Sequence, residues 1–229
     1  NERGGLIAYD AVRGRPARLT NGPVWHPLGA VMDGSDDRII SSAVETMTGV
    51  THGTLIYYGA ITSASEFDGL LTNQATNRSA LLKASNGAGG GNLAYIWEAP
   101  ADEYDGNSGV SLTPLASRVG LAAVVVTPSQ AMVYVNGTTA INSVSHGTND
   151  WTGEWQLGVD DVSGLNRAPA GRIEACYAYN RALTRGELDW IYADPYAMFA
   201  PPVWRQYFVP AAAPPPTTRT SRLSLLGVS

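Results

Sequence analysis

Short apolar or alternating runs, separated by Gly, Asn, Asp, Pro and Ser, fill the chain up to about residue 180. Alternation of apolar and polar residues is typical of half-buried strands, and turn residues between the runs mark where strands end. So many short runs with almost no helical pattern indicate two sheets packed face to face. The pattern predicts strands over residues 5–9, 30–32, 38–41, 54–61, 69–72, 80–84, 93–98, 119–127, 131–135, 138–141, 155–159 and 172–179.

Two runs lack this alternation: Leu55-Ile56-Tyr57-Tyr58 and Val124-Val125-Val126. Apolar residues on both faces of a strand indicate a central strand that is covered on both sides. The clearest local pattern is a hairpin over 131–141. Its centre, Asn136-Gly137, supplies the residues with φ > 0 that a type I′ turn requires.

One short helix is predicted after these strands. Thr184 and Glu187 have the spacing of a capping box, in which the threonine caps the helix and the glutamate bonds back to its amide. Leu183 and Leu188 are placed to pack together across the first turn, and Asp194-Pro195 ends the helix. We expect this helix to close one end of the sandwich.

The composition changes after Pro195, so the sequence predicts a sandwich over 1–195 and an extended C-terminal arm over 196–229. The arm begins with an aromatic segment and continues into a Pro-rich stretch, which has little apolar surface to offset its ordering entropy. A neighbouring subunit is the most economical way to hold such an arm, which favours a homo-oligomer or a larger assembly; packing on its own domain is the alternative. The side chains predicted to bind the partner are Tyr196, Phe199, Trp204, Tyr207 and Phe208.

Charge and composition exclude some classes of partner. The chain has 15 Lys+Arg against 20 Asp+Glu, a net charge of −5, so no overall positive field attracts nucleic acid or an anionic membrane. No apolar run approaches the ~20 residues that cross a bilayer. A single cysteine, Cys176, allows neither an intramolecular disulfide nor a cysteine metal cluster. The chain begins at Asn1 without a signal-peptide pattern, and this residue need not be the natural start.

Catalytic patterns are weak in this sequence. A glycosidase needs two facing carboxylates, and the nearest approach to a Glu-x-Asp-x-x-Glu pattern is Glu187-Leu188-Asp189, with Tyr192 in the third position. The capping box also makes Glu187 a helix residue, so we expect no catalytic residues and no enzyme. The acidic residues between 98 and 105 are expected in a solvated loop. His26, His52 and His146 lack zinc-ligand spacing and are expected to serve packing or hydrogen bonding.

Calcium is the one cofactor that the residues leave open. Asp160, Asp161 and Asn166 offer hard oxygen ligands, as does a second group formed by Asp33, Asp36 and Asp37. An Asp-Gly-Ser-Asp-Asp stretch also forms plain turns in which the side chains bond their own backbone, so both interpretations stay open.

Sugar binding would need an exposed aromatic side chain beside polar groups. The candidates for such a platform are Trp97, Tyr104, Trp151 and Trp155. Burial in the core or in a protein interface is the alternative for each of them.

Several stretches together resemble a known family. Residues 5–9 (Gly-Leu-Ile-Ala-Tyr) resemble its opening strand and 19–25 its second element, while 30–39 are similar to its Phe-Asp-Gly-x-Asp-Asp stretch, with Met32 replacing the aromatic residue. Residues 171–184 resemble its last strand and Tyr-Asn-Arg-Ala-Leu corner, although Cys176 and Ala178 are small for that strand. These stretches resemble, in order, the laminin-G-like branch of the concanavalin-A-like lectin domain family.

The resemblance implies an all-β, two-sheet antiparallel jelly-roll sandwich with one short C-terminal helix. Because this fold hosts lectins, glycosidases and structural modules, it does not by itself imply a function. Residues 194–209 resemble the ending of phage-encoded members, which implies a virion location and a role as a capsid decoration or cementing protein. Its partners would then be other virion proteins such as the major capsid protein. The alternative is a carbohydrate-binding module for attachment to a host surface, with a glycan as partner.

Overall fold

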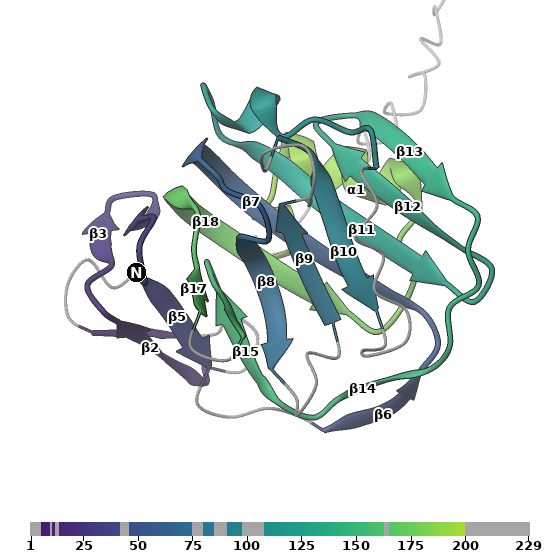
Figure 1. The fold of residues 1–229 in the computed structure, drawn as a ribbon, viewed down its shortest axis with the longest axis horizontal. Coiled ribbons are helices and arrows are strands. Elements are labelled where there is room, and N and C mark those ends of the chain that lie inside the picture. Colours follow the sequence, from purple (N-terminus) through teal and green to yellow (C-terminus); the bar gives the residue numbers. More distant parts are fainter. Residues whose placement is uncertain are drawn as a thin grey trace, which may run out of the picture. The chain divides into compact units, whose positions relative to one another are not determined.

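Two antiparallel sheets stacked face to face make up the fold (Figure 1). The computed structural model describes residues 6–9, 11, 14–41, 46–74, 80–84, 91–97, 108–162 and 165–199. At positions 74, 81, 161, 162, 165 and 166 it describes the backbone but not the side chain. The described chain forms one unit that ends at Phe199. A two-sheet antiparallel sandwich with one helix is confirmed.

The first sheet has the strand order β1-β2-β5-β15-β8-β9-β10. Its strands are β1 (Ile7–Tyr9), β2 (Pro16–Thr20), β5 (Arg38–Ser41), β15 (Glu154–Leu157), β8 (Gly69–Gln74), β9 (Ala80–Ala84) and β10 (Leu93–Trp97).

The second sheet has the order β13-β12-β11-β7-β18-β4-β3. Its strands are β13 (Thr138–Asn142), β12 (Gln130–Val135), β11 (Gly120–Thr127), β7 (Gly53–Ser63), β18 (Ala170–Tyr179), β4 (Gly29–Asp33) and β3 (Val24–His26).

Smaller elements complete the described chain. Two pairs of short strands stand apart from the large sheets, β6 (Met47–Val50) with β14 (Asn149–Trp151) and β16 (Asp160–Val162) with β17 (Leu165–Arg167). The helical elements are α1 (Arg185–Ala193) and the 3₁₀ turns η1 (Thr113–Leu115) and η2 (Ala197–Phe199). Within the described residues, no helix is long and apolar enough to cross a membrane.

The two central strands β7 and β11 are buried on both faces, as their unbroken apolar runs predict. Leu55 and Val124 face the core between the sheets, while Ile56, Leu121 and Val125 face outward into a second cluster. Helix α1 covers this outer face with Leu188 and Ile191.

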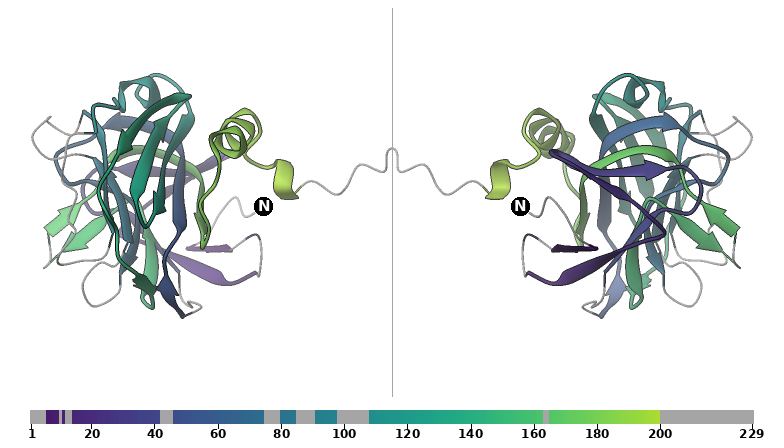
Figure 2. Two further views of the ribbon diagram at one scale, coloured as in Figure 1. Left: turned by 90° about the vertical axis from the view of Figure 1, so that its right-hand side faces the viewer. Right: turned by 90° about the vertical axis from the view of Figure 1, so that its left-hand side faces the viewer.

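The predicted place of the helix is therefore wrong. Helix α1 lies on the outer face of the second sheet rather than at one end of the sandwich (Figure 2). The physical reason is that the outer face of β7 and β11 is apolar. Burying this face against the apolar side of the helix removes both surfaces from water.

The predicted local structures are confirmed. The hairpin joins β12 to β13 through Asn136 (φ 48°) and Gly137 (φ 90°), both in the left-handed region that the turn requires. At the helix, the Thr184 hydroxyl accepts from the Glu187 N–H at 3.2 Å, and the Glu187 carboxylate accepts from the Thr184 N–H at 2.7 Å. This backbone bond is the main reason why the pKa of Glu187 lies below its usual value.

Strands β2, β3, β6, β14, β16 and β17 were not in the predicted set. Each has only three to five residues, too few to show a period. Strand β14 pairs with β6, about 100 residues earlier in the chain, so this pairing depends on the tertiary fold rather than on local sequence.

Candidate functional site

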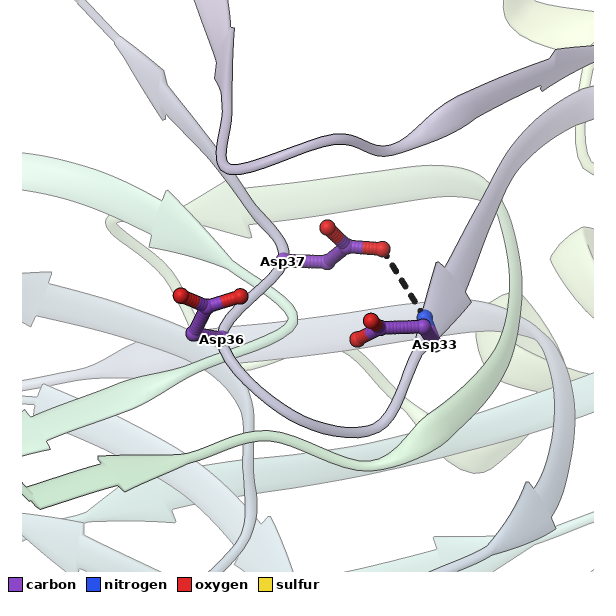
Figure 3. Close-up of side chains that lie close together, drawn as sticks. All are labelled: Asp33, Asp36 and Asp37. Carbon is purple, nitrogen blue, oxygen red and sulfur yellow. Dashed lines mark hydrogen bonds between the residues drawn. The ribbon is translucent and has the colours of Figure 1, made fainter.

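Three aspartates gather in the turn that carries the chain from one sheet to the other. Asp33 ends β4 in the second sheet, Asp36 and Asp37 follow, and β5 of the first sheet begins at the next residue. One carboxylate oxygen from each aspartate lies within 4.8 Å of one oxygen of both others (Figure 3). We call residues 33–37 the aspartate turn.

Hydrogen bonds within the turn explain its shape. The Ser35 N–H donates to Asp33 Oδ1 at 2.8 Å, and the Asp33 N–H donates to Asp37 Oδ2 at 2.9 Å. Gly34 has φ 85°, and a Cβ there would lie 2.8 Å from the Cβ of Ala170, so a side chain at this position would clash. These bonds confirm the interpretation as a turn in which the Asp33 and Asp37 side chains bond to the backbone of the turn itself.

A second turn packs against the aspartate turn. The Asn21 side-chain amide donates to the Asp36 carbonyl at 3.0 Å, and Asn21 itself has φ 71°. The adjacent Gly22 has φ 120°, and a Cβ there would lie 3.5 Å from Asp37 Oδ1. Residues 19–25 and 30–39, the two stretches that resembled successive family motifs, thus contact each other in the fold. Their separation in the sequence could not reveal this contact.

Asp37 is the unusual member of the group. Its side chain is buried, with the residue 2% exposed, and its Oδ1 has no hydrogen-bond donor within the described chain. Burial raises the pKa of the Asp37 carboxyl, the bond from the Asp33 amide opposes this, and the charges of Asp33 and Asp36 raise it further. A buried carboxylate oxygen beside two other carboxylates fits the ligand preference of a hard cation such as Ca²⁺.

The other calcium hypothesis falls on the hairpin of β16 and β17. Asp160 is fully buried, and its Oδ2 lies 3.8 Å from the Arg167 guanidinium. Arg167 also lies over the ring of Phe67, at 4.5 Å from the centroid. Asp161 and Asn166 pair in register across the hairpin, and their side chains lie outside the description. Since Asp160 already faces a cation, the aspartate turn is the better candidate metal centre.

Two of the aromatic residues proposed as a sugar platform belong to the core. Trp97 and Trp151 have no exposed surface and pack edge to face, with ring centroids 6.0 Å apart. Trp155 is half-buried and packs on Trp151 at 5.3 Å. The platform interpretation is thus wrong for Trp97 and Trp151, because the core between the sheets needs their volume; Tyr104 lies outside the described residues.

The histidines serve hydrogen bonding, as expected. Tyr95 and His146 are buried and bonded through the Tyr95 hydroxyl and His146 Nε2 at 2.8 Å. His26 Nδ1 accepts from the Leu28 N–H, and His52 Nδ1 bonds to the Thr51 hydroxyl.

The carboxylates near the helix also have structural partners. Glu187 holds the helix cap, and Asp189 Oδ1 accepts from the Tyr134 hydroxyl at 2.8 Å. The acidic residues between 98 and 105 lie outside the described residues.

An aromatic surface lies on the turn that follows the helix. Tyr196, Met198 and Phe199 are 46%, 36% and 39% exposed, and we call these three residues the aromatic surface. The ring of Phe199 stacks on Tyr177 with centroids 6.2 Å apart, and the Tyr177 hydroxyl donates to the Pro195 carbonyl at 2.6 Å. The ring contact holds Phe199 on the sandwich, and the Tyr196 hydroxyl donates to the Glu174 carbonyl at 3.2 Å, so two of the predicted partner-binding residues are held there. Trp204, Tyr207 and Phe208 lie outside the described residues, so their role stays a prediction.

Sequence inspection missed a further exposed aromatic side chain, Trp190 on helix α1, which is 52% exposed. The signal was present: Leu188 and Ile191 define the buried face of the helix, and residue 190 lies off that face at 100° per residue.

Comparison with known proteins gives relatives in structure only. No family model and no curated protein matches the sequence. Trypanosoma rangeli sialidase is similar with a TM-score of 0.57 and 14% identity, over 86% of this chain and 32% of the sialidase. The botulinum neurotoxin serotype D binding domain is similar at 0.55 and 12%, over 80% of this chain and 47% of that domain. Domain 4 of AbnA, a GH43 extracellular arabinanase from Geobacillus stearothermophilus, is similar at 0.50 and 18%, over 82% of each chain.

These likenesses establish the fold as a β-sandwich of the concanavalin-A-like kind. The chain spans about a third of the length of the sialidases that it matches. The expectation that the protein is not an enzyme is contradicted, because its neighbours include sialidases and a mutant displaying trans-sialidase activity. The absence of a complete Glu-x-Asp-x-x-Glu pattern near Glu187 is therefore not enough to exclude an enzyme with this fold. The phage origin and virion location stay predictions.

Proposed function

We propose that this sandwich is a carbohydrate-binding domain. The observation that carries the proposal is the match to domain 4 of AbnA, which covers 82% of each chain and whose structure is a complex with arabinotriose. A match over nearly the whole of both chains compares one domain with one domain. The sialidases, one of them in complex with sialic acid, support the same class of ligand.

The aromatic surface is the proposed platform for the sugar. A sugar ring presents apolar C–H groups on its faces, which stack on an aromatic ring that is both exposed and rigidly held. Phe199 and Tyr196 meet both conditions, since Phe199 stacks on Tyr177 and the Tyr196 hydroxyl donates to the Glu174 carbonyl at 3.2 Å. Trp97 and Trp151 meet neither, because they have no surface to offer.

Charge favours a neutral oligosaccharide over an acidic one. The chain carries a net charge of −5, and Asp194 lies two residues before Tyr196, whose N–H donates to its carboxylate. An anionic sugar would approach against this charge.

The test is calorimetric titration of the intact chain with arabinotriose and with sialyllactose. We expect saturable binding of arabinotriose, weaker binding of sialyllactose, and a loss of at least tenfold in affinity with Phe199→Ala or Tyr196→Ala. Leu28→Ala is the matched control, because Leu28 is 58% exposed but lies in the turn between β3 and β4. The proposal fails if neither sugar binds, or if the control loses as much affinity as the aromatic variants.

A protein contact at the same surface is a second candidate function. The exposure of Tyr196, Met198 and Phe199 favours it, since exposed aromatic and Met side chains are enriched at protein interfaces. Assembly into a virion, with the major capsid protein as partner, is the specific form of this hypothesis that the sequence resemblance implies. Light scattering of the intact chain, with and without Phe199→Ala, tests for self-association. An intact chain that is monomeric at all concentrations would remove the homo-oligomer from this hypothesis.

A further inference from the structure

A β-bulge interrupts strand β18 next to the aromatic surface. Ile173 of β18 pairs with Gly59 of β7. The next pair is Ala175 with Tyr58, so Glu174 is an extra residue with no partner opposite it. A bulge of this kind re-aims the side chains of its strand and is over-represented beside functional sites.

The bulge changes which side chains of β18 face outward. In a regular strand, residues an odd number of positions apart lie on opposite faces. Ile173 and Cys176 nevertheless both pack on the core between the sheets, although they are three positions apart. Tyr177 consequently faces outward, where the ring of Phe199 stacks on it. The aromatic surface therefore depends on the extra residue at position 174.

Glu174 itself is held in place by Arg172. Its Oε1 accepts from Arg172 Nε at 2.9 Å and from Nη2 at 2.6 Å, and the two side chains are only 8% and 25% exposed. Within the described chain, Glu174 Oε2 accepts no hydrogen bond, and the guanidinium keeps further N–H donors. The pair is thus rigid but still has both an acceptor and a donor to offer.

Two tyrosines lie beside this pair. The Tyr196 hydroxyl donates to the Glu174 carbonyl at 3.2 Å, and its side chain is part of the exposed aromatic surface. Burial, and after it the charge of Glu174, raise the pKa of both Tyr58 and Tyr196, so the carboxylate acts on both hydroxyls. An exposed aromatic ring next to fixed polar groups is the combination that a sugar site requires.

We infer that Glu174 and Arg172 are the hydrogen-bonding groups of the sugar site, an inference that rests on the proposed carbohydrate binding. A sugar ring stacked on Tyr196 presents its hydroxyl groups at the ring edge, where one donates to Glu174 Oε2 and a neighbouring one accepts from the Arg172 guanidinium. Hydrogen bonds to charged groups are the stronger ones, so these two should select the ligand. The site then takes a neutral sugar with two adjacent free hydroxyls, because Glu174 repels a sugar carboxylate.

The test is calorimetric titration of the intact chain and of Glu174→Gln with arabinotriose. Glutamine keeps the shape of the side chain and an oxygen for Arg172, and we expect affinity to fall about tenfold or more. Glu174→Asp keeps the charge but withdraws the carboxylate by one methylene group, so it should weaken binding similarly. Glu154→Gln is the matched control, since it neutralises an exposed carboxylate on β15 of the other sheet and should bind as the intact chain does.

Arabinotriose analogues that each lack one hydroxyl group separate direct contact from a structural role. Deleting the hydroxyl that Glu174 binds should weaken binding to the intact chain but have little further effect on Glu174→Gln. A side chain that only supports the fold would give the same loss with both proteins for every analogue, and this result would overturn the inference. Circular dichroism checks that each variant folds, and Glu174→Asp takes the place of Glu174→Gln if the latter does not.

The outcomes distinguish this inference from the proposed function. If arabinotriose binds and Phe199→Ala weakens it, but both Glu174 variants bind as tightly as the intact chain, the sugar site stands and the roles of Glu174 and Arg172 are wrong. If arabinotriose does not bind the intact chain at all, the proposed function fails and this inference fails with it.

Discussion

Removing the charge of Asp36 should stabilise the metal-free protein. Asp36→Asn keeps the size and shape of the side chain and breaks no hydrogen bond of that side chain within the described residues. What it removes is the repulsion between Asp36 and its two neighbours, Asp33 and Asp37, whose oxygens lie within 4.8 Å. In the presence of a chelator, the free energy of unfolding at neutral pH should therefore rise.

The magnitude follows from this distance. Two unit charges 4.8 Å apart repel by about 0.9 kcal/mol at the dielectric constant of water and about 3.5 kcal/mol at an effective dielectric of 20. Asp33 is exposed and Asp36 half-exposed, so the lower value applies best, once for each neighbour. We expect a gain of about 1–2 kcal/mol. Salt should reduce this gain only slightly, because the distance between the charges is shorter than the screening length of ~8 Å.

The gain should depend on pH with a defined sign. The pKa of Asp37 is raised above its ordinary value of 3.8, chiefly by burial and further by the charges of Asp33 and Asp36. A carboxyl whose pKa is higher in the folded state binds protons more tightly there, so it lowers stability as the pH rises from 3.8 through the folded-state pKa. The part of the difference that arises from the repulsion between Asp36 and Asp37 should thus develop across this interval and disappear well below pH 3.8, where the Asp37 carboxyl is protonated.

Urea unfolding followed by circular dichroism, in chelator and at a series of pH values, measures this difference. A variant less stable than the unmodified chain at pH 7 would refute the electrostatic reasoning. A gain in stability of the same size at acid pH would also refute it, because a gain that does not depend on pH could not arise from charge.

Other changes test the packing of the fold, each by urea unfolding. Leu188→Ala should cost about 2–5 kcal/mol, because Leu188 is fully buried against the outer face of the second sheet; a loss near zero would mean that the helix does not pack there. Thr184→Ala should cost about 1 kcal/mol by removing the helix cap, with no loss if the cap does not form in solution. Tyr95→Phe should cost about 1–3 kcal/mol, since it leaves buried His146 Nε2 and the amide of Asn142 without the hydroxyl that bonds both at 2.8 Å; an unchanged stability would contradict this network.

Local patterns were enough to predict the structures that depend on neighbouring residues. The Asn136-Gly137 turn and the Thr184–Glu187 cap formed as predicted, because the backbone conformation of each is set within a few residues. The double-sided apolar runs of β7 and β11 correctly indicated strands covered on both faces. The grouping of Asp33, Asp36 and Asp37 could be predicted because they share one short turn, and calcium binding there stays a prediction.

Only the tertiary structure decided which residues meet across the chain. Trp97 could have been an exposed platform or a core residue, and packing against Trp151, more than fifty positions away, made it core. The helix could have closed the end of the sandwich, but it lies where the outer face of β7 and β11 offers apolar area to bury. The sequence alone determined the fold class and most of the secondary structure, but not the six short strands β2, β3, β6, β14, β16 and β17, since hydrophobic periodicity and turn chemistry act over a few residues. The burial of each side chain was decided by contacts between distant strands, and local sequence does not encode these contacts.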